Sequence, residues 1–227
     1  MRWSRWAECT SWSVTLRADR APARRLCGAA QAGATLALAL SAAGAHAHTS
    51  AKGVGDFYAG FLHPLTALEH VLPFLALGML AGQQGQRSQA SLPVFWIALM
   101  LGATAALWLP SLPAVDLTNI LSALVLGALI AAAFPLPAPV YIVLAVLFGL
   151  SHGYANGTVI TPLIKPYLFI PGVGLAGLVV TGYGVIATDY IQRRKVGWMS
   201  IAVRVAGSWI AAIGMLVLAT SWKRVVG

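Results

Sequence analysis

The chain has 227 residues, of which 59% are hydrophobic and only 9% are charged, and its mean hydropathy is +0.78. Soluble globular domains carry about 25% charged residues, so this composition excludes a water-soluble enzyme and a disordered chain. The net charge of +9 comes from basic residues that are scattered at segment ends and form no stripe. That distribution is typical of a membrane protein and not of a nucleic-acid-binding surface, so the sequence predicts an integral membrane protein of one domain.

The first 47 residues have the order of a secretory signal peptide. A basic leader over residues 1–28 precedes an apolar run from Ala29 to Ala43. At about 15 residues this run is too short to cross a bilayer about 30 Å thick. Two small-x-small sites follow, so we expect cleavage after Ala45 or after Ala47; the alternative is an uncleaved anchor.

Cleavage would remove both cysteines, Cys9 and Cys27, so a metal site in the mature chain would have to use imidazole, carboxylate, amide or backbone oxygen. Cleavage after Ala45 would place His48 third from a free amine, behind His46. The amine, two backbone amides and that imidazole can form a square-planar site suited to Cu(II) or Ni(II). Cleavage after Ala47 would remove this geometry.

Six apolar stretches follow, each with the roughly 17–25 residues that a transmembrane helix needs. They are Phe57–Gly82, Leu92–Leu109, Leu117–Phe134, Ala138–Ala155, Tyr167–Ile191 and Ile201–Trp222. Short connections with glycine or proline make neighbouring helices antiparallel, and backbone hydrogen bonding in lipid leaves helices as the only option here. The prediction is an all-α polytopic membrane helix bundle, with six transmembrane helices over residues 48–227 after a cleaved signal peptide.

A cleaved signal peptide would put the mature N-terminus outside the cytoplasm. Arg87 and the basic cluster over residues 193–195 then fall on cytoplasmic loops, whereas Lys52, Lys165, Lys223 and Arg224 fall outside, so the two sides carry four basic residues each. The cluster is the main support for this orientation under the positive-inside rule. We therefore expect a multi-pass protein of the bacterial inner membrane. Its expected partner is the lipid bilayer, and we expect it to bind no nucleic acid.

Ionisable side chains are scarce within the six stretches, and inside a membrane they are costly and usually functional. Asp189 and Arg193 lie four residues apart near the cytoplasmic end of the fifth stretch, where an i,i+4 ion pair explains both. Arg204 can extend its guanidinium to the same surface. We expect these three residues to lie outside the functional site.

The first stretch differs, because His63, Glu69 and His70 lie close together in an otherwise apolar segment. On one continuous helix, His63 and His70 would share a face about 10 Å apart along the axis. Pro64 and Pro73 would each free a backbone carbonyl one turn earlier. These groups are candidate metal ligands, although histidines buried in a core can also be purely structural.

The predicted topology brings two further polar residues toward this segment. Asp116 begins the third stretch and His152 lies near the outer end of the fourth, so His63, Asp116 and His152 fall in one outer layer. Glu69 and His70 lie deeper, toward the midplane. Imidazole with carboxylate favours nickel, cobalt, zinc or copper over magnesium or calcium, and two layers of ligands suit a permeation path.

Three segments carry a family resemblance. They are His63-Pro64-Leu65-Thr66-Ala67-Leu68-Glu69-His70, Asp116 followed by Ser122-Ala123-Leu124-Val125-Leu126-Gly127, and Ser151-His152-Gly153-Tyr154-Ala155-Asn156-Gly157. Together they resemble the HupE/UreJ family, small membrane proteins associated with hydrogenase and urease gene clusters and regarded as nickel or cobalt permeases. The sequence departs from the family pattern at Ala67 (usually Gly), Glu69 (usually Asp) and Asn156 (usually His), which leaves an altered metal preference or a loss of transport open.

The resemblance covers nearly the whole mature chain and implies a secondary permease for a divalent transition metal. Nickel is the first expectation and cobalt the next, as transported substrate and not as cofactor. The residues implied in metal binding are His63, Glu69, His70, Asp116, His152 and, after cleavage, His46 or His48; the supporting residues are Thr66, Tyr154 and Asn156.

Two other functions remain open. A non-transporting accessory protein for urease or hydrogenase maturation would use its polar groups only to tie helices together. An intramembrane hydrolase is more distant: Gly149-Leu150-Ser151-His152-Gly153 matches Gly-x-Ser-x-Gly, but no strand–turn–helix context is predicted. Adjacent side chains on a helix also point about 100° apart, so Ser151 could not use His152 as its base and would need His63 or His70 instead. We therefore predict that the chain is not an enzyme.

Overall fold

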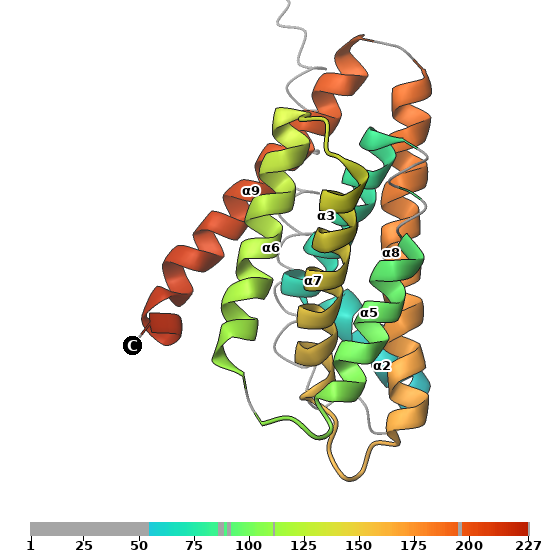
Figure 1. Cartoon of the computed structure of the whole chain (residues 1–227), viewed down its shortest axis with the longest axis vertical. Coiled ribbons are helices and arrows are strands. Elements are labelled where there is room, and N and C mark those ends of the chain that lie inside the picture. Colours follow the sequence, from blue (N-terminus) through green and yellow to red (C-terminus); the bar gives the residue numbers. More distant parts are fainter. Residues whose placement is uncertain (1–54, 86–88, 90–91, 111, 195–196, 227) are drawn as a thin grey trace, which may run out of the picture. The chain divides into compact units, whose positions relative to one another are not determined.

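The computed structural model describes residues 55–85, 89, 92–110, 112–194 and 197–226. Within these residues the chain forms seven helices and no strand, which confirms the all-α prediction. The helices are α2 (Asp56–Thr66), α3 (Leu68–Gln84), α5 (Leu92–Ala105), α6 (Pro113–Ala132), α7 (Ala138–Gly157), α8 (Pro166–Arg193) and α9 (Gly197–Val226) (Figure 1). The predicted signal peptide, with His46 and His48, lies outside the described residues and stays a prediction.

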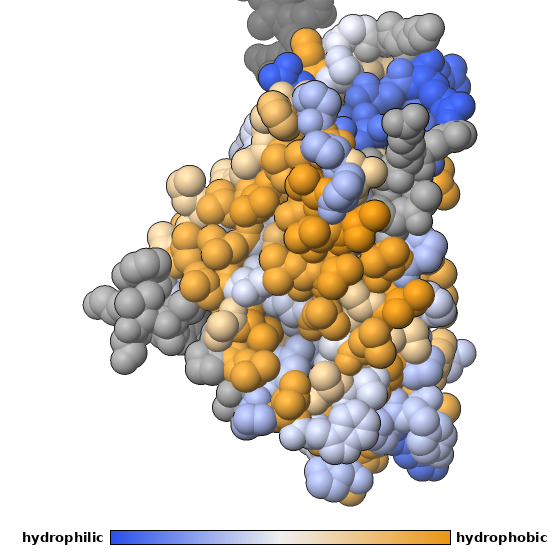
Figure 2. Space-filling view, viewed as in Figure 1, coloured by the Kyte–Doolittle hydropathy of each residue, from blue (hydrophilic) through white to orange (hydrophobic). Residues whose placement is uncertain are grey.

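By length and composition, the four helices α6 to α9 can each cross a membrane. The bent pair α2 and α3 would make a fifth span, whereas α5 is apolar but has only 14 residues. The structure thus places helices in all six predicted stretches but supports four or five spans and not six. Figure 2 shows apolar side chains across the middle of the visible face and the most hydrophilic ones toward its ends, as a multi-pass membrane protein requires.

The first predicted stretch is not one helix. The helix α2 ends at Thr66 and α3 begins at Leu68, and the two helix axes are bent by 78°. Between them Ala67 has an extended backbone, with φ −99° and ψ 110°. The prediction of a continuous helix, with two histidines about 10 Å apart along its axis, is therefore wrong.

The break lies between two prolines, Pro64 in α2 and Pro73 in α3. Each lacks the N–H that would bond to the carbonyl one turn earlier, so the helix is weakened on both sides of Ala67. The Thr66 hydroxyl donates to the carbonyls of Leu62 and His63, at 3.1 and 3.0 Å. These bonds stabilise the end of α2, where the regular helical donors are missing.

Glycines let the helices pack closely. The helix α5 packs on α7, α2 and α3 pack on α8, and α9 packs on α6 (Figure 1). On α7, a Cβ added to Gly153 would overlap the carbonyl of Leu99, and one added to Gly157 would overlap that of Ala103. Only a residue without a side chain allows this approach of two backbones.

Side-chain hydrogen bonds hold the middle and the far end of α3 against its neighbours. The buried Tyr141 hydroxyl of α7 donates to the Leu77 carbonyl of α3 at 2.7 Å. The Gln84 amide donates to the Phe134 carbonyl at 2.7 Å and accepts from the Leu136 N–H at 3.0 Å. These bonds fix α3 to α7 and to the turn between α6 and α7. The buried His70 in the first turn of α3 therefore lies inside the bundle.

Candidate metal-binding site

The break places His70 of α3 directly against His152 of α7. Their Nδ1 atoms are 2.9 Å apart, within hydrogen-bond distance, and the two rings meet at 81°. Both side chains are buried, with exposed fractions of 3% and 0%. The prediction that His152 lies in a layer outside His70 is therefore wrong, because the bend between α2 and α3 carries His70 to the same depth as His152.

A serine from a third helix joins this pair. The Oγ atom of Ser122, fully buried on α6, is 2.8 Å from Nε2 of His152. The same hydroxyl donates to the backbone carbonyl of Asn119 at 2.6 Å. Sequence reasoning used Ser122 only as part of a family segment and missed Asn119. The available signal was two polar residues three apart, and therefore on one face, in an apolar helix.

The polar contacts continue along the interface of α6 and α7. The Ser151 hydroxyl donates to Oδ1 of Asn119 at 2.5 Å and not to an imidazole. Asn156, where the family has a second histidine, is fully buried, and its Nδ2 donates to the His152 carbonyl at 2.7 Å. The Asn156 Oδ1 atom is buried with no hydrogen-bond partner among the described residues. This seam of buried polar side chains ends at the two imidazoles.

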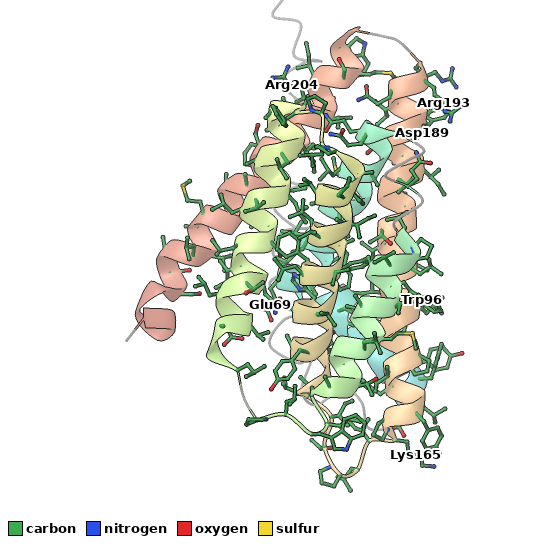
Figure 3. The ribbon with its side chains drawn as sticks, in the orientation of Figure 1. Glu69, Trp96, Lys165, Asp189, Arg193 and Arg204 are labelled. Carbon is green, nitrogen blue, oxygen red and sulfur yellow. The ribbon has the colours of Figure 1, made fainter. Side chains whose placement is uncertain are left out.

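Glu69 and His63 lie beside the pair without completing a coordination shell. The Glu69 side chain is 65% exposed, and its Oε1 is 4.0 Å from Nε2 of His70, which is too long for a hydrogen bond. The half-buried ring of His63 lies 6.1 Å from the His70 ring, centroid to centroid. In Figure 3 Glu69 lies between the end that carries Arg193 and the end that carries Lys165.

The remaining predicted residues lie at helix ends. Asp116 is exposed in the first turn of α6, beside Val115, whose carbonyl is 3.4 Å from the Ser151 hydroxyl. The Tyr154 hydroxyl donates to the Pro110 carbonyl and so ties α7 to the segment before α6. Thr66 stabilises the end of α2, as described above. The hydroxyls of Thr66 and Tyr154 thus bond backbone carbonyls and not the two buried imidazoles.

An aromatic side chain that sequence reasoning did not predict covers the pair. The buried Phe74 ring of α3 is stacked on His70, with centroids 6.4 Å apart, and meets His152 edge-on at 5.5 Å. Phe95 of α5 packs edge-on against Phe74 at 5.3 Å. The imidazoles therefore have an apolar wall on one side and the seam of α6 and α7 on the other.

The described residues contain no group of three or more His, Cys, Asp or Glu side chains placed to hold a metal ion. What they contain is two imidazoles in contact and a carboxylate 4.0 Å from one of them. Nitrogen and oxygen donors of this kind suit nickel, cobalt or zinc.

The predicted ion pair of Asp189 and Arg193, near the C-terminal end of α8, is confirmed. Nε of Arg193 is 2.7 Å from Oδ2 of Asp189, and Figure 3 shows both at the same end as Arg204. Nε of Arg204 donates to the Ala131 carbonyl at 2.8 Å and so satisfies the end of α6. These charges are far from Glu69 in the same view.

If the chain carries metal ions, as proposed below, Asp189→Asn should leave their uptake within about twofold of the parent, because exposed ion pairs contribute only about 0–1 kcal/mol. Uptake by cells with matched membrane abundance of the two proteins checks this. A defect as severe as that of a histidine variant would contradict it and would indicate a second gate at this end of α8.

Comparison with known proteins agrees with the sequence segments quoted above. The family described as HupE / UreJ protein matches residues 15–217, which include every described member of the candidate site. Protein HupE of Rhizobium leguminosarum bv. viciae is 28% identical over 175 residues, which cover 77% of this chain and 90% of that protein. No solved structure matches the chain.

Proposed function

This chain belongs to the HupE/UreJ family, and we propose that it is a secondary permease for a divalent transition-metal ion, nickel first and cobalt next. The observation that carries the proposal is the contact between His70 and His152, buried inside apolar membrane helices. The metal ion is the transported substrate and not a resident cofactor.

Energetics support a functional role for the pair. Burying polar groups in an apolar interior is costly unless they are hydrogen-bonded, and polar residues at membrane depth are rare for that reason. One serine or threonine would tie two helices together at lower cost. Two imidazoles with Glu69 nearby instead supply the donor types that nickel and cobalt prefer.

We propose a route with an exposed entrance and a buried transfer point. Asp116 at the start of α6 attracts the cation, and His63, Glu69 and His70 pass it inward, with His152 in contact with His70 at the transfer point. Conduction requires that an ion bind well enough to enter and weakly enough to leave, so the lack of a three-ligand group in the described residues fits a permease better than a storage site.

We also propose that the end of α8 with Arg193 and Arg194 faces the cytoplasm of a bacterial inner membrane, with the mature N-terminus outside. Lys165 lies at the other end of α8 (Figure 3), and the basic residues after α8 support this orientation through the positive-inside rule. N-terminal sequencing of the purified protein tests the cleavage step, and a Met1 terminus would contradict it.

The alternative is an accessory protein for urease or hydrogenase maturation that transports nothing. The hydrogen bonds of Asn119, Ser122 and Ser151 across α6 and α7 would then serve only to join helices.

Nickel uptake separates the two functions. We expect bacteria that lack their own nickel importers to accumulate nickel above the vector level when they express the chain, and excess cobalt to reduce that uptake. The control is the chain with both His70 and His152 replaced by alanine, at matched membrane abundance. If the parent chain is abundant in the membrane but nickel, cobalt and zinc stay at vector level, the permease proposal is wrong.

A further inference from the structure

We infer that Ser122 determines the tautomers of both buried histidines, so that His70 presents the lone pair of Nε2 to the metal ion. His152 is then a positioning residue and not a ligand. The metal in this inference rests on the proposed function, whereas the tautomers are a property of the metal-free protein and can be tested without it.

The Ser122 hydroxyl has a single hydrogen to donate. The Ser122 Oγ lies 2.6 Å from the Asn119 carbonyl oxygen, and a carbonyl oxygen can only accept. With that hydrogen donated, the Ser122 Oγ can only accept from Nε2 of His152, 2.8 Å away. His152 therefore carries its hydrogen on Nε2.

The second step passes from His152 to His70. A neutral imidazole carries one N–H, so Nδ1 of His152 has a lone pair. Nδ1 of His70 lies 2.9 Å from it, and one of these two nitrogens has to donate. His70 is the donor, and its other nitrogen, Nε2, keeps a lone pair.

The opposite direction of hydrogen bonding among Ser122, His152 and His70 is less favourable. If Ser122 donated to His152, then His152 would donate from Nδ1 to His70, and His70 would carry its hydrogen on Nε2. The acceptor on that side would be Oε1 of Glu69, which at 4.0 Å is outside hydrogen-bond range. The Ser122 Oγ would also lie 2.6 Å from the Asn119 carbonyl oxygen with no hydrogen between the two oxygens.

The favoured direction makes His70 the ligand and excludes His152. Both ring nitrogens of His152 are engaged, at 2.8 and 2.9 Å, so a metal ion could bind His152 only after one bond broke. Nε2 of His70 is 4.0 Å from Oε1 of Glu69, so a small movement of the exposed Glu69 side chain would let both atoms bind one ion through bonds of about 2.0–2.2 Å. Metal-binding histidines commonly donate their second N–H to an orienting acceptor, and here that acceptor is His152.

Nitrogen-15 NMR of the full chain in lipid bilayers, with labelled histidine and no metal, tests the tautomers. Protonated and unprotonated ring nitrogens give separate signals, and the spectra of His70→Asn and His152→Asn assign them. We expect a hydrogen on Nδ1 of His70 and on Nε2 of His152. The reverse pair of tautomers would overturn the inference.

Variants of the serine test its role separately from packing. Ser122→Ala should give mixed tautomers at both histidines, whereas Ser122→Thr, which keeps the hydroxyl, should retain the parent pattern. Ser151→Ala is the matched control, since it removes a neighbouring buried hydroxyl that bonds Asn119 and no imidazole. Unchanged tautomers in Ser122→Ala, or equal mixing in Ser151→Ala, would overturn the inference.

Addition of zinc alone identifies the ligating nitrogen. We expect the signal of Nε2 of His70 to move while His152 keeps its hydrogen on Nε2; a zinc shift at a His152 nitrogen would contradict the inference. If NMR shows the inferred tautomers but the chain takes up no metal, only the proposed function is contradicted. Normal uptake with reversed tautomers would contradict only this inference.

Discussion

Nickel uptake is expected to fall to the vector level when His70 is replaced by alanine. The substitution removes the imidazole that contacts His152 and whose Nε2 is 4.0 Å from Oε1 of Glu69, so the proposed route loses a nitrogen donor at its buried transfer point. Changes around metal ligands commonly cost about 10–100-fold in affinity or activity. Uptake of nickel, cobalt and zinc at matched membrane abundance measures the effect.

Substitutions of Glu69 should also lower uptake, by an amount that depends on the new side chain. We expect Glu69→Gln to lower uptake by at least about tenfold, since it removes the anionic oxygen, and Glu69→Asp to give a partial defect or a changed metal preference. Thr181→Ala is the matched control, because this buried residue of α8 bonds only carbonyls of its own helix. If both His70→Ala and Glu69→Gln transport all three metals like the parent, α3 is structural and the permease proposal fails.

The second large effect is expected on folding. Gly153→Ala should sharply lower the amount of protein in the membrane and its thermal midpoint, because the new Cβ would overlap the Leu99 carbonyl of α5. Overpacking of this kind typically costs about 1–3 kcal/mol, and here backbone has to move. The same shift would displace His152, one residue earlier in α7. Membrane abundance and the melting temperature in detergent measure the change.

Gly182→Ala provides the matched control for that prediction. Gly182 lies within the helix α8, and nothing lies within 4 Å of a Cβ added there. Alanine favours a helix over glycine by about 1 kcal/mol, so this variant should be at least as stable as the parent. Equal melting temperatures for Gly153→Ala and Gly182→Ala would show that α5 and α7 can separate without loss of stability.

The helical class and the membrane environment follow from the sequence by itself. Long apolar stretches with few charges have one stable form in lipid, in which each backbone donor finds its acceptor four residues away. The ion pair of Asp189 and Arg193 is equally local, since both residues lie on one helix at a spacing of four. The grouping of His63, Glu69 and His70 could also be read directly, because these residues are neighbours in the chain.

Only the tertiary structure decided how His70 meets His152 and which residues complete the site. The sequence alone shows that Pro64 and Pro73 each remove one backbone hydrogen bond from a helix. It does not show that the chain bends by 78° at Ala67. Contacts between α3, α6 and α7 depend on the rotation of each helix about its axis, which close glycine packing sets. A rotation by one residue, about 100°, would turn Ser122 away from His152, and for this reason Ser122 and Asn119 could not be identified until the helices were packed.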